Sequence, residues 1–188
     1  MTSAPNEPSS GIERIATPRL ALTAHTLADF ARFLHAPKRF AQSAGLASVP
    51  APLAPDVRRG LTRRCDVASG LDDDKSVWEN LWSVATREGN LFVGAFCFKG
   101  FPDGRDAEIA YYIEEAFRNR GYMTETLRAV VDWARKRDDV AAITAETFLT
   151  NAASQRVLVK AGFERYRDAS FVSSDSCGWR FDLGRAPY

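Results

Sequence analysis

A short segment between a predicted strand and a predicted helix carries the residues whose types and spacing are most suggestive of chemistry. Residues 108–113 (Glu-Ile-Ala-Tyr-Tyr-Ile) have the apolar character of a central strand, and residues 124–137 carry apolar side chains at helical spacing. Between them, residues 118–123 (Arg-Asn-Arg-Gly-Tyr-Met) contain a glycine and two arginines. Free backbone N–H groups and the positive end of the helix dipole make a helix start a favourable place for phosphate. The segment therefore predicts a phosphate-binding turn, and the alternative is an ordinary surface turn capped by Thr124.

Composition excludes several classes of protein. The 188 residues contain 25 Lys and Arg against 24 Asp and Glu, a net charge of +1, which gives no global field for nucleic acid or an anionic membrane. No apolar run approaches the roughly 20 residues of a membrane span, and the first residues lack the pattern of a secretory signal. Three cysteines and two histidines at wide spacing predict neither a disulfide framework nor a metal site. We expect a cytoplasmic protein without nucleic-acid or membrane partners.

The order of predicted elements indicates an α/β domain with a mixed sheet covered by helices. Residues 1–11 are rich in proline and serine and are predicted to be a disordered leader, so that the domain spans residues 12–188. Apolar periodicity and turn residues predict, in the first half of the chain, a strand at 15–22 with Pro18 at a sheet edge, a helix after Thr26, and a helix that Asp72–Asp74 open and that carries Trp78 and Leu81. They then predict a hairpin of 82–86 and 91–98, a strand at 140–148, and a helix at 151–161 that stops at Gly162.

A second segment, residues 146–163, supplies a match to a known family. Arg-x-x-Gly-x-Met at 118–123, followed by Asn-x-x-Ser at 151–154 and Lys-x-Gly-Phe at 160–163, resembles the GNAT superfamily of acyl-CoA-dependent N-acyltransferases. Thr-Pro-Arg-Leu at 17–20 is similar to the opening of its RimJ/RimL-like branch, which acetylates ribosomal-protein N-termini. The resemblance departs from the family pattern at its last turn residue, where a methionine stands in place of glycine or alanine.

The resemblance implies a single-domain, mostly antiparallel mixed sheet and acetyl-CoA as co-substrate, without a metal. The acceptor implied is a primary amine, either a protein N-terminus or a small molecule, and a homodimer is left open. The coenzyme's pyrophosphate would lie on the backbone of the turn, and its pantetheine arm beside the strand before it. The residues implied in coenzyme binding are Ile113, Arg118, Asn119, Arg120, Gly121, Tyr122, Met123, Thr124 and Asn151.

Acetyl transfer to an amine requires a group that removes a proton from the attacking nitrogen. Glu108, at the start of the central strand, stands where several family members have their general base, and it could act through a water. The alternative is a solvated glutamate paired with Arg105, and Glu114 and Glu115 are the remaining carboxylate candidates.

The thioester needs a donor for its carbonyl oxygen and a group that assists the leaving sulfur. The resemblance implies the backbone N–H of Ile113 as the carbonyl donor. Leu158 occupies the place where many family members have a tyrosine that acts as the general acid. Ser154 is the remaining candidate, and it would position a water or the sulfur. Ser154 could instead stabilise the start of its helix, and Asn151 could cap that helix.

Two other hypotheses fit the same residues. Leu158 and Met123 are compatible with a non-catalytic acyl-CoA-binding or sensing module, and the arginine-containing turn alone is compatible with a nucleotide-phosphate binder. Four arginines at positions 58, 59, 63 and 64 could face an acidic substrate, although a solvated helix face is the default interpretation.

Overall fold

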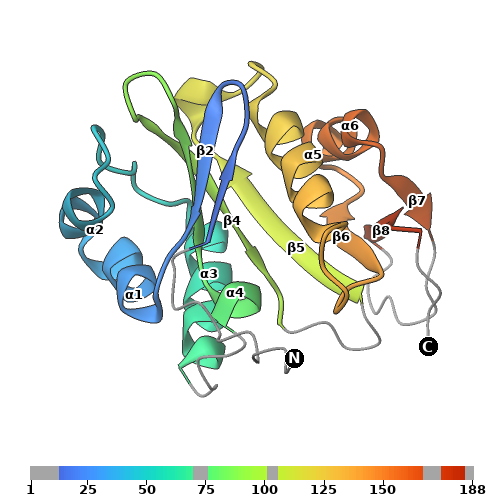
Figure 1. The fold of residues 1–188 in the computed structure, drawn as a ribbon, viewed down its shortest axis with the longest axis horizontal. Helices are drawn as coiled ribbons and strands as arrows, with labels where there is room; N and C mark the ends of the chain where they lie inside the picture. Colours follow the sequence, from blue (N-terminus) through green and yellow to red (C-terminus); the bar gives the residue numbers. More distant parts are fainter. Residues whose placement is uncertain (1–12, 70–75, 101–105, 167–174, 185–188) are drawn as a thin grey trace, which may run out of the picture.

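An eight-stranded sheet in the order β1-β2-β3-β4-β5-β6-β8-β7 forms the centre of the protein (Figure 1). The computed structural model describes residues 13–69, 76–100, 106–166 and 175–184, so the predicted leader lies outside the described residues. All neighbouring strands are antiparallel except β5 and β6, which are parallel, and this confirms the predicted mixed, mostly antiparallel sheet. The strands are β1 (Arg14–Ala16), β2 (Leu20–Ala24), β3 (Trp82–Thr86), β4 (Phe92–Phe98), β5 (Asp106–Ile113), β6 (Ala142–Phe148), β7 (Glu164–Tyr166) and β8 (Ser176–Asp182).

The first predicted strand is in fact a hairpin of two strands. β1 and β2 pair antiparallel, and the Thr17 N–H donates to the Leu20 carbonyl at 2.9 Å to close the turn that contains Pro18. The prediction of one strand over residues 15–22 was wrong, because proline's fixed φ suits a tight turn as well as a sheet edge. The edge position itself is confirmed, since β1 is the outermost strand on its side of the sheet.

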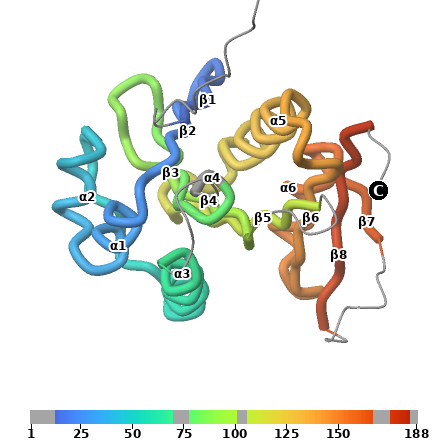
Figure 2. The backbone as a smooth tube through the Cα atoms, turned by 60° about the horizontal axis from the view of Figure 1, so that its bottom comes forward, coloured from blue at the N-terminus to red at the C-terminus, as the bar shows by residue number. Residues whose placement is uncertain are grey.

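Helices cover both faces of the sheet, with α1, α2 and α3 on one side and α5 and α6 on the other (Figure 2). The Thr26 side chain caps α1, as predicted, and α6 begins after Asn151 and ends at Gly162, whose φ is 94°. The predicted helix start at Asp72–Asp74 lies outside the described residues, and Leu81 lies beyond the short helix α4. The helix bounds are α1 (Leu27–His35), α2 (Pro37–Ser43), α3 (Pro55–Ala68), α4 (Ser76–Glu79), η2 (Glu115–Phe117, a 3-10 helix), α5 (Tyr122–Ala134) and α6 (Ala152–Ala161).

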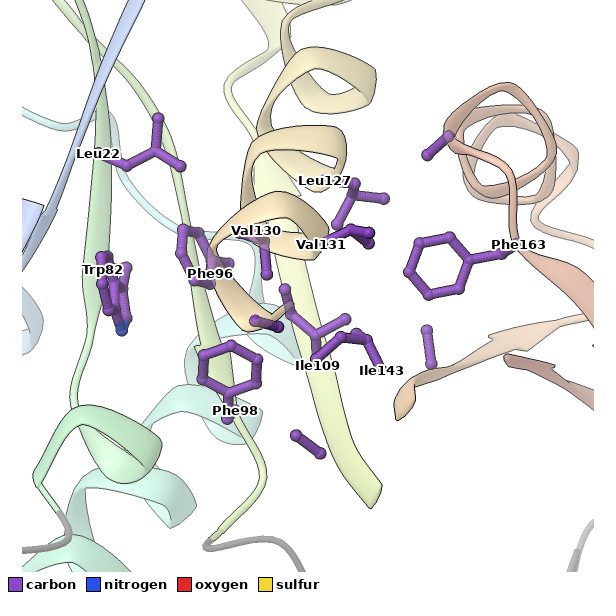
Figure 3. Close-up of a cluster of buried hydrophobic side chains, with 14 of the residues drawn as sticks. Leu22, Trp82, Phe96, Phe98, Ile109, Leu127, Val130, Val131, Ile143 and Phe163 are labelled. Carbon is purple, nitrogen blue, oxygen red and sulfur yellow. The ribbon is translucent and has the colours of Figure 1, made fainter. Parts of the chain in front are cut away.

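Two apolar clusters fix these layers. On one face, Leu127, Val130 and Val131 of α5 point toward Ile109 and Ile143 of the neighbouring strands β5 and β6 (Figure 3). On the other face, phenylalanines of α1, α2 and β4 pack against one another and against α3. Because α5 is anchored by this buried stripe, its first turn is held at the end of β5. No helix within the described segments has both the length and the apolar character required to traverse a bilayer.

Candidate functional site

The parallel strands β5 and β6 separate after three paired residues. Pairing is confined to Asp106–Glu108 and Ala142–Thr144, although both strands continue beyond it. The Lys99 N–H donates to the Glu108 carbonyl at 2.7 Å, and the Glu114 N–H donates to the Val93 carbonyl at 2.9 Å. Even-numbered residues of this stretch therefore direct their backbone groups toward β4. Because backbone groups of alternate residues point to opposite edges of a strand, the N–H groups of the odd-numbered residues 109, 111 and 113 face the opening.

The predicted phosphate-binding turn has a backbone that leaves N–H groups unpaired within the helix. Asn119 and Gly121 both have positive φ, 61° and 76°, and no side chain in the described part of the chain caps α5. The first intrahelical hydrogen bond runs from the Glu125 N–H to the Gly121 carbonyl at 3.0 Å. The N–H groups at positions 122–124 therefore have no acceptor within the helix. The alternative in which Thr124 caps the helix is wrong, since the N-cap residue is Gly121. Met123, which stands where the family pattern has glycine or alanine, is buried at 4% exposure, so its side chain lies away from these N–H groups.

Arg19 clamps this turn from the β1–β2 hairpin. Its guanidinium donates to the Arg120 carbonyl at 3.1 Å and to the Glu125 carboxylate at 2.6 Å, and it lies 4.7 Å from the centre of the Tyr122 ring. Glu125 also accepts from the Thr17 hydroxyl at 2.6 Å. Burial alone raises the pKa of Glu125, but the hydrogen bonds from Thr17 and Arg19 outweigh it and hold the pKa below its usual value. A groove of about 910 Å³ between the hairpin and α5 reaches the turn.

Glu108 lies in a cleft on the opposite face of the sheet, at the point where β5 and β6 part. The cleft has a volume of about 500 Å³ and is bounded by α3, β4 and β5. Glu108 forms an ion pair with Lys99, and its side chain is 36% exposed. The suggested alternative partner, Arg105, lies outside the described residues. The residues that line the cleft are Val57, Gly60, Leu61, Arg63, Arg64, Ala95, Cys97, Lys99, Glu108, Ala110, Tyr111 and Tyr112.

A tyrosine that sequence reasoning missed meets Ser154 across the opening. The Tyr111 hydroxyl lies 2.7 Å from the Ser154 hydroxyl, and the Ser154 N–H donates to the Asn151 side chain at 3.1 Å. Asn151 therefore caps α6, which confirms one of its two interpretations. Burial raises the pKa of Tyr111 to about 12, while the hydrogen bond between the Tyr111 and Ser154 hydroxyls opposes the rise. Leu158 is fully buried in the core.

Comparison with known proteins identifies the family. Residues 19–164 match the Acetyltransferase (GNAT) domain. The chain belongs to the GNAT acetyltransferase family. Two curated relatives come from Bacillus subtilis: the uncharacterized N-acetyltransferase YjdG, 32% identical over 83 residues, and the probable N-acetyltransferase YjcK, 41% identical over 59 residues. These matches cover 44% and 31% of this chain, which spans about half of YjdG (49%) and a third of YjcK (33%).

Solved structures share the GNAT fold over nearly the whole chain. A GNAT-family acetyltransferase from Bacillus anthracis has a TM-score of 0.61 at 15% identity and covers 92% of this chain and 100% of its own. The RimL ribosomal L7/L12 alpha-N-protein acetyltransferase in complex with coenzyme A has a TM-score of 0.60 at 15% identity, with coverages of 90% and 98%. At these identities the likeness concerns the fold.

The remaining carboxylate candidates of this GNAT domain lie at the far end of β5. The Glu114 carboxylate accepts from the Ala51 N–H at 2.6 Å and so ties down the loop before α3. Burial raises the pKa of Glu114, and the bond from Ala51 opposes the rise. Glu115 is exposed in η2, where its carbonyl accepts from the Arg118 N–H at 3.2 Å. Among the described side chains, no three His, Cys, Asp or Glu residues converge to form a metal site.

Proposed function

We propose that the protein is an acetyl-CoA-dependent N-acetyltransferase of RimJ/RimL-like type, which transfers an acetyl group to a primary amine by direct attack in a ternary complex. The observation that carries the proposal is the placement of three features along β5: the helix-start turn after its end, the opening between β5 and β6, and the carboxylate-bearing cleft where that opening begins. A donor lying along the opening and an acceptor in the cleft would therefore meet where the two strands part.

The turn is the proposed site of the coenzyme's pyrophosphate. The N–H groups of Gly121, Tyr122, Met123 and Thr124 would hold the phosphates, as expected at a helix N-terminus. The Arg118 N–H is already bonded to Glu115, so Arg118 would contribute its exposed guanidinium, as would Arg120. Asn119 would contribute through its left-handed backbone, which orients the amides that follow it.

The pantetheine arm would lie in the opening and pair with the free edge of β5. Of the residues whose N–H groups face the opening, Ile113 lies nearest to the turn, so its N–H suits an amide of the arm. Five residues of strand, about 16 Å, separate Ile113 from Glu108, too far for both to act on one reacting carbon. The Tyr111 N–H lies between Glu108 and the turn and is the better carbonyl donor, which revises the role expected for Ile113. Asn151 would add a contact from its side-chain amide.

The proposed chemistry uses one base and one hydroxyl pair. Glu108 would accept a proton from the acceptor ammonium through a water, and the freed nitrogen would attack the thioester carbon. The carbon–sulfur bond then breaks, and the electron pair leaves with sulfur as a thiolate. Ser154, held by the Tyr111 hydroxyl, would donate a hydrogen bond to that sulfur, and the thiolate takes up the proton that the attacking nitrogen loses as the amide forms.

The acceptor class remains a protein N-terminus or a small amine. The fold relative RimL is named for acetylating a ribosomal protein at its α-amino group, which supports the first class. The second class is supported by the size of the cleft, about 500 Å³, which lies within the range of small-molecule sites.

Calorimetry with coenzyme A and thiol release from acetyl-CoA with a panel of amines test the proposal. We expect coenzyme binding and amine-dependent thiol release above the hydrolysis background. Absence of coenzyme binding would refute the proposal. Tight binding without transfer to any amine would instead support a non-catalytic acyl-CoA-binding module, which the buried Leu158 favours because it replaces the usual acidic tyrosine.

A further inference from the structure

The cleft beside Glu108 has a basic wall. Arg63 and Arg64 of α3 line it, and among the described residues no carboxylate forms an ion pair or hydrogen bond with either. The cleft's own carboxylate, Glu108, is paired with Lys99. The cleft therefore presents positive charge that the described part of the chain leaves uncompensated.

Helical spacing directs part of this charge into the cleft. Val57, Gly60, Leu61 and Arg64 recur at i, i+3, i+4 and i+7 and so share the face of α3 that borders the cleft. Arg64 is half-buried, and its charge acts on the Cys97 thiol in the floor. Burial raises the pKa of Cys97 to about 12, and Arg64 opposes that rise.

The same helix offers two arginines that are absent from the cleft. Arg58 and Arg59 are exposed and do not line it, which is the arrangement expected of a solvated helix face. Gly60 leaves space, because no heavy atom of the described residues, its chain neighbours and the nearby backbone of α3 aside, lies within 4 Å of the position where a Cβ would stand. The interpretation of all four arginines as one solvated face therefore fails for the half-buried Arg64, whereas Arg63 is exposed at the rim of the cleft.

We infer that the acceptor is an amine that also carries a carboxylate, with its amine end at Glu108 and its carboxylate at Arg63 and Arg64. This inference rests on the proposed function and specifies its substrate class. A guanidinium binds a carboxylate through paired, charge-assisted hydrogen bonds, whereas a cationic acceptor would be repelled by the same wall. The two sources of such a ligand are an acidic peptide N-terminus and a small amino acid-like amine.

The test compares acceptors that differ in one charge. For peptides, these are Ser-Glu, Ser-Gln and Ser-Lys dipeptide amides, and for small amines, β-alanine and β-alaninamide, in which an uncharged amide replaces the carboxylate. In the series that matches the natural acceptor, we expect kcat/KM for the compound with the carboxylate to exceed that of its amide counterpart by about tenfold. The lysine peptide should be the poorest of the peptides. The preference should shrink as salt is raised. Equal rates for charged and neutral acceptors in both series would overturn the inference while leaving the proposed function intact.

Variants of α3 provide the matched control. In R63Q/R64Q the ratio of kcat/KM between the carboxylate-bearing acceptor and its amide counterpart should fall close to one, with coenzyme affinity unchanged. In R58Q/R59Q, which removes the same charge from the same helix, the preference should persist. A preference retained in the first variant, or lost equally in both, would contradict the assignment.

A steric variant tests whether the cleft receives the acceptor at all. G60L should fill the open space without a clash and raise the KM for the amine about tenfold while leaving coenzyme affinity unchanged. An unchanged amine KM in G60L would overturn the inference, and loss of coenzyme binding in the wild-type protein would refute the proposed function itself.

Discussion

The turn before α5 and the cleft beside α3 are built in opposite ways. The turn is fixed by contacts within the chain: two left-handed residues shape its backbone, and Arg19 and Glu125 clamp it. The cleft is lined by side chains with few such contacts, including Arg63 and Arg64 and the open space at Gly60.

This difference indicates which region sets which specificity. A site made of backbone N–H groups recognises a feature common to every acyl-CoA, the pyrophosphate, and tolerates changes of exposed side chains around it. A site made of side chains with few contacts inside the chain can change its ligand preference with one substitution. We therefore expect mutations at the turn to abolish coenzyme binding and mutations in the cleft to redirect the acceptor.

The largest effect is expected for Gly121→Asp. A side chain there is strained at φ +76°, and its carboxylate would repel the pyrophosphate. Coenzyme affinity should fall by more than about 100-fold, since charge-assisted contacts are each worth roughly 1.5–3 kcal/mol. Isothermal calorimetry measures the loss.

Gly45→Asp is the matched control for strain. Gly45 also has a positive φ, +66°, and lies in the loop after α2; apart from its chain neighbours, no described residue has a heavy atom within 4 Å of the place that a Cβ would take. Both variants should lose roughly 1–2 kcal/mol of unfolding free energy, but Gly45→Asp should keep coenzyme affinity. Equal losses of affinity would show that strain alone explains the first result.

Glu108→Gln should lower kcat by about 100-fold, the usual scale for loss of a general base, with little change in coenzyme affinity. The acid limb of the pH–rate profile should disappear with it. Glu114→Gln is the comparison, because Glu114 is the competing carboxylate. Its raised pKa means that a base at Glu114 would lose its ionised form at higher pH than an ordinary glutamate. A profile unchanged in Glu108→Gln and altered in Glu114→Gln would exchange the two assignments.

Local patterns in the sequence predicted most of the fold. Asn151 and Gly162 mark both ends of α6, because a capping side chain and a left-handed glycine act within one turn of the chain. The start of α5 was misplaced at Thr124, since threonine is an ordinary cap and the left-handed Gly121 leaves no such mark. The first hairpin was missed because similar apolar residues flank Pro18 on both sides.

Long-range contacts of the site could not be predicted. Arg19 and Glu125 are 106 residues apart, and Tyr111 and Ser154 are 43 apart. No periodicity encodes such pairs, because packing of the sheet against the helices brings them together. The motifs could therefore indicate a coenzyme site but not the clamp that shapes it or the hydroxyl pair beside it.

Tyr111→Phe should lower kcat by about tenfold, because Ser154 would lose the hydroxyl that orients it and a hydrogen bond between neutral groups is worth about 0.5–1.5 kcal/mol. The informative readout is leaving-group dependence. With acetyl thioesters of more acidic thiols, the defect should shrink, since such thiolates need less stabilisation. Tyr112→Phe is the control, because the buried Tyr112 hydroxyl has no hydrogen-bond partner among the described residues and its removal should not alter that dependence. A defect in Tyr111→Phe that is the same for all leaving groups would indicate a purely structural role.

The smallest effect is expected at the clamp, for Glu125→Gln. The Arg19 side chain is 49% exposed, so loss of the ion pair should weaken coenzyme binding only about threefold and cost at most about 1 kcal/mol of stability. Because the pKa of Glu125 is held below its ordinary value of 4.5, its stabilising contribution is complete above that pH. The contribution is lost as pH falls through the lower, folded-state pKa. Thermal unfolding should therefore separate wild type from Glu125→Gln at neutral pH and bring them together in acid.

Asp132→Asn completes this comparison on the same helix. Asp132 pairs only with its neighbour Arg135 among the described residues, and its side chain is 68% exposed, so its removal should leave coenzyme affinity unchanged. If Asp132→Asn weakens coenzyme binding as much as Glu125→Gln does, the effect reflects the overall charge of α5. If only Glu125→Gln acts, the hairpin that begins at β1 belongs functionally to the turn it holds, although 106 residues of chain separate Arg19 from Glu125.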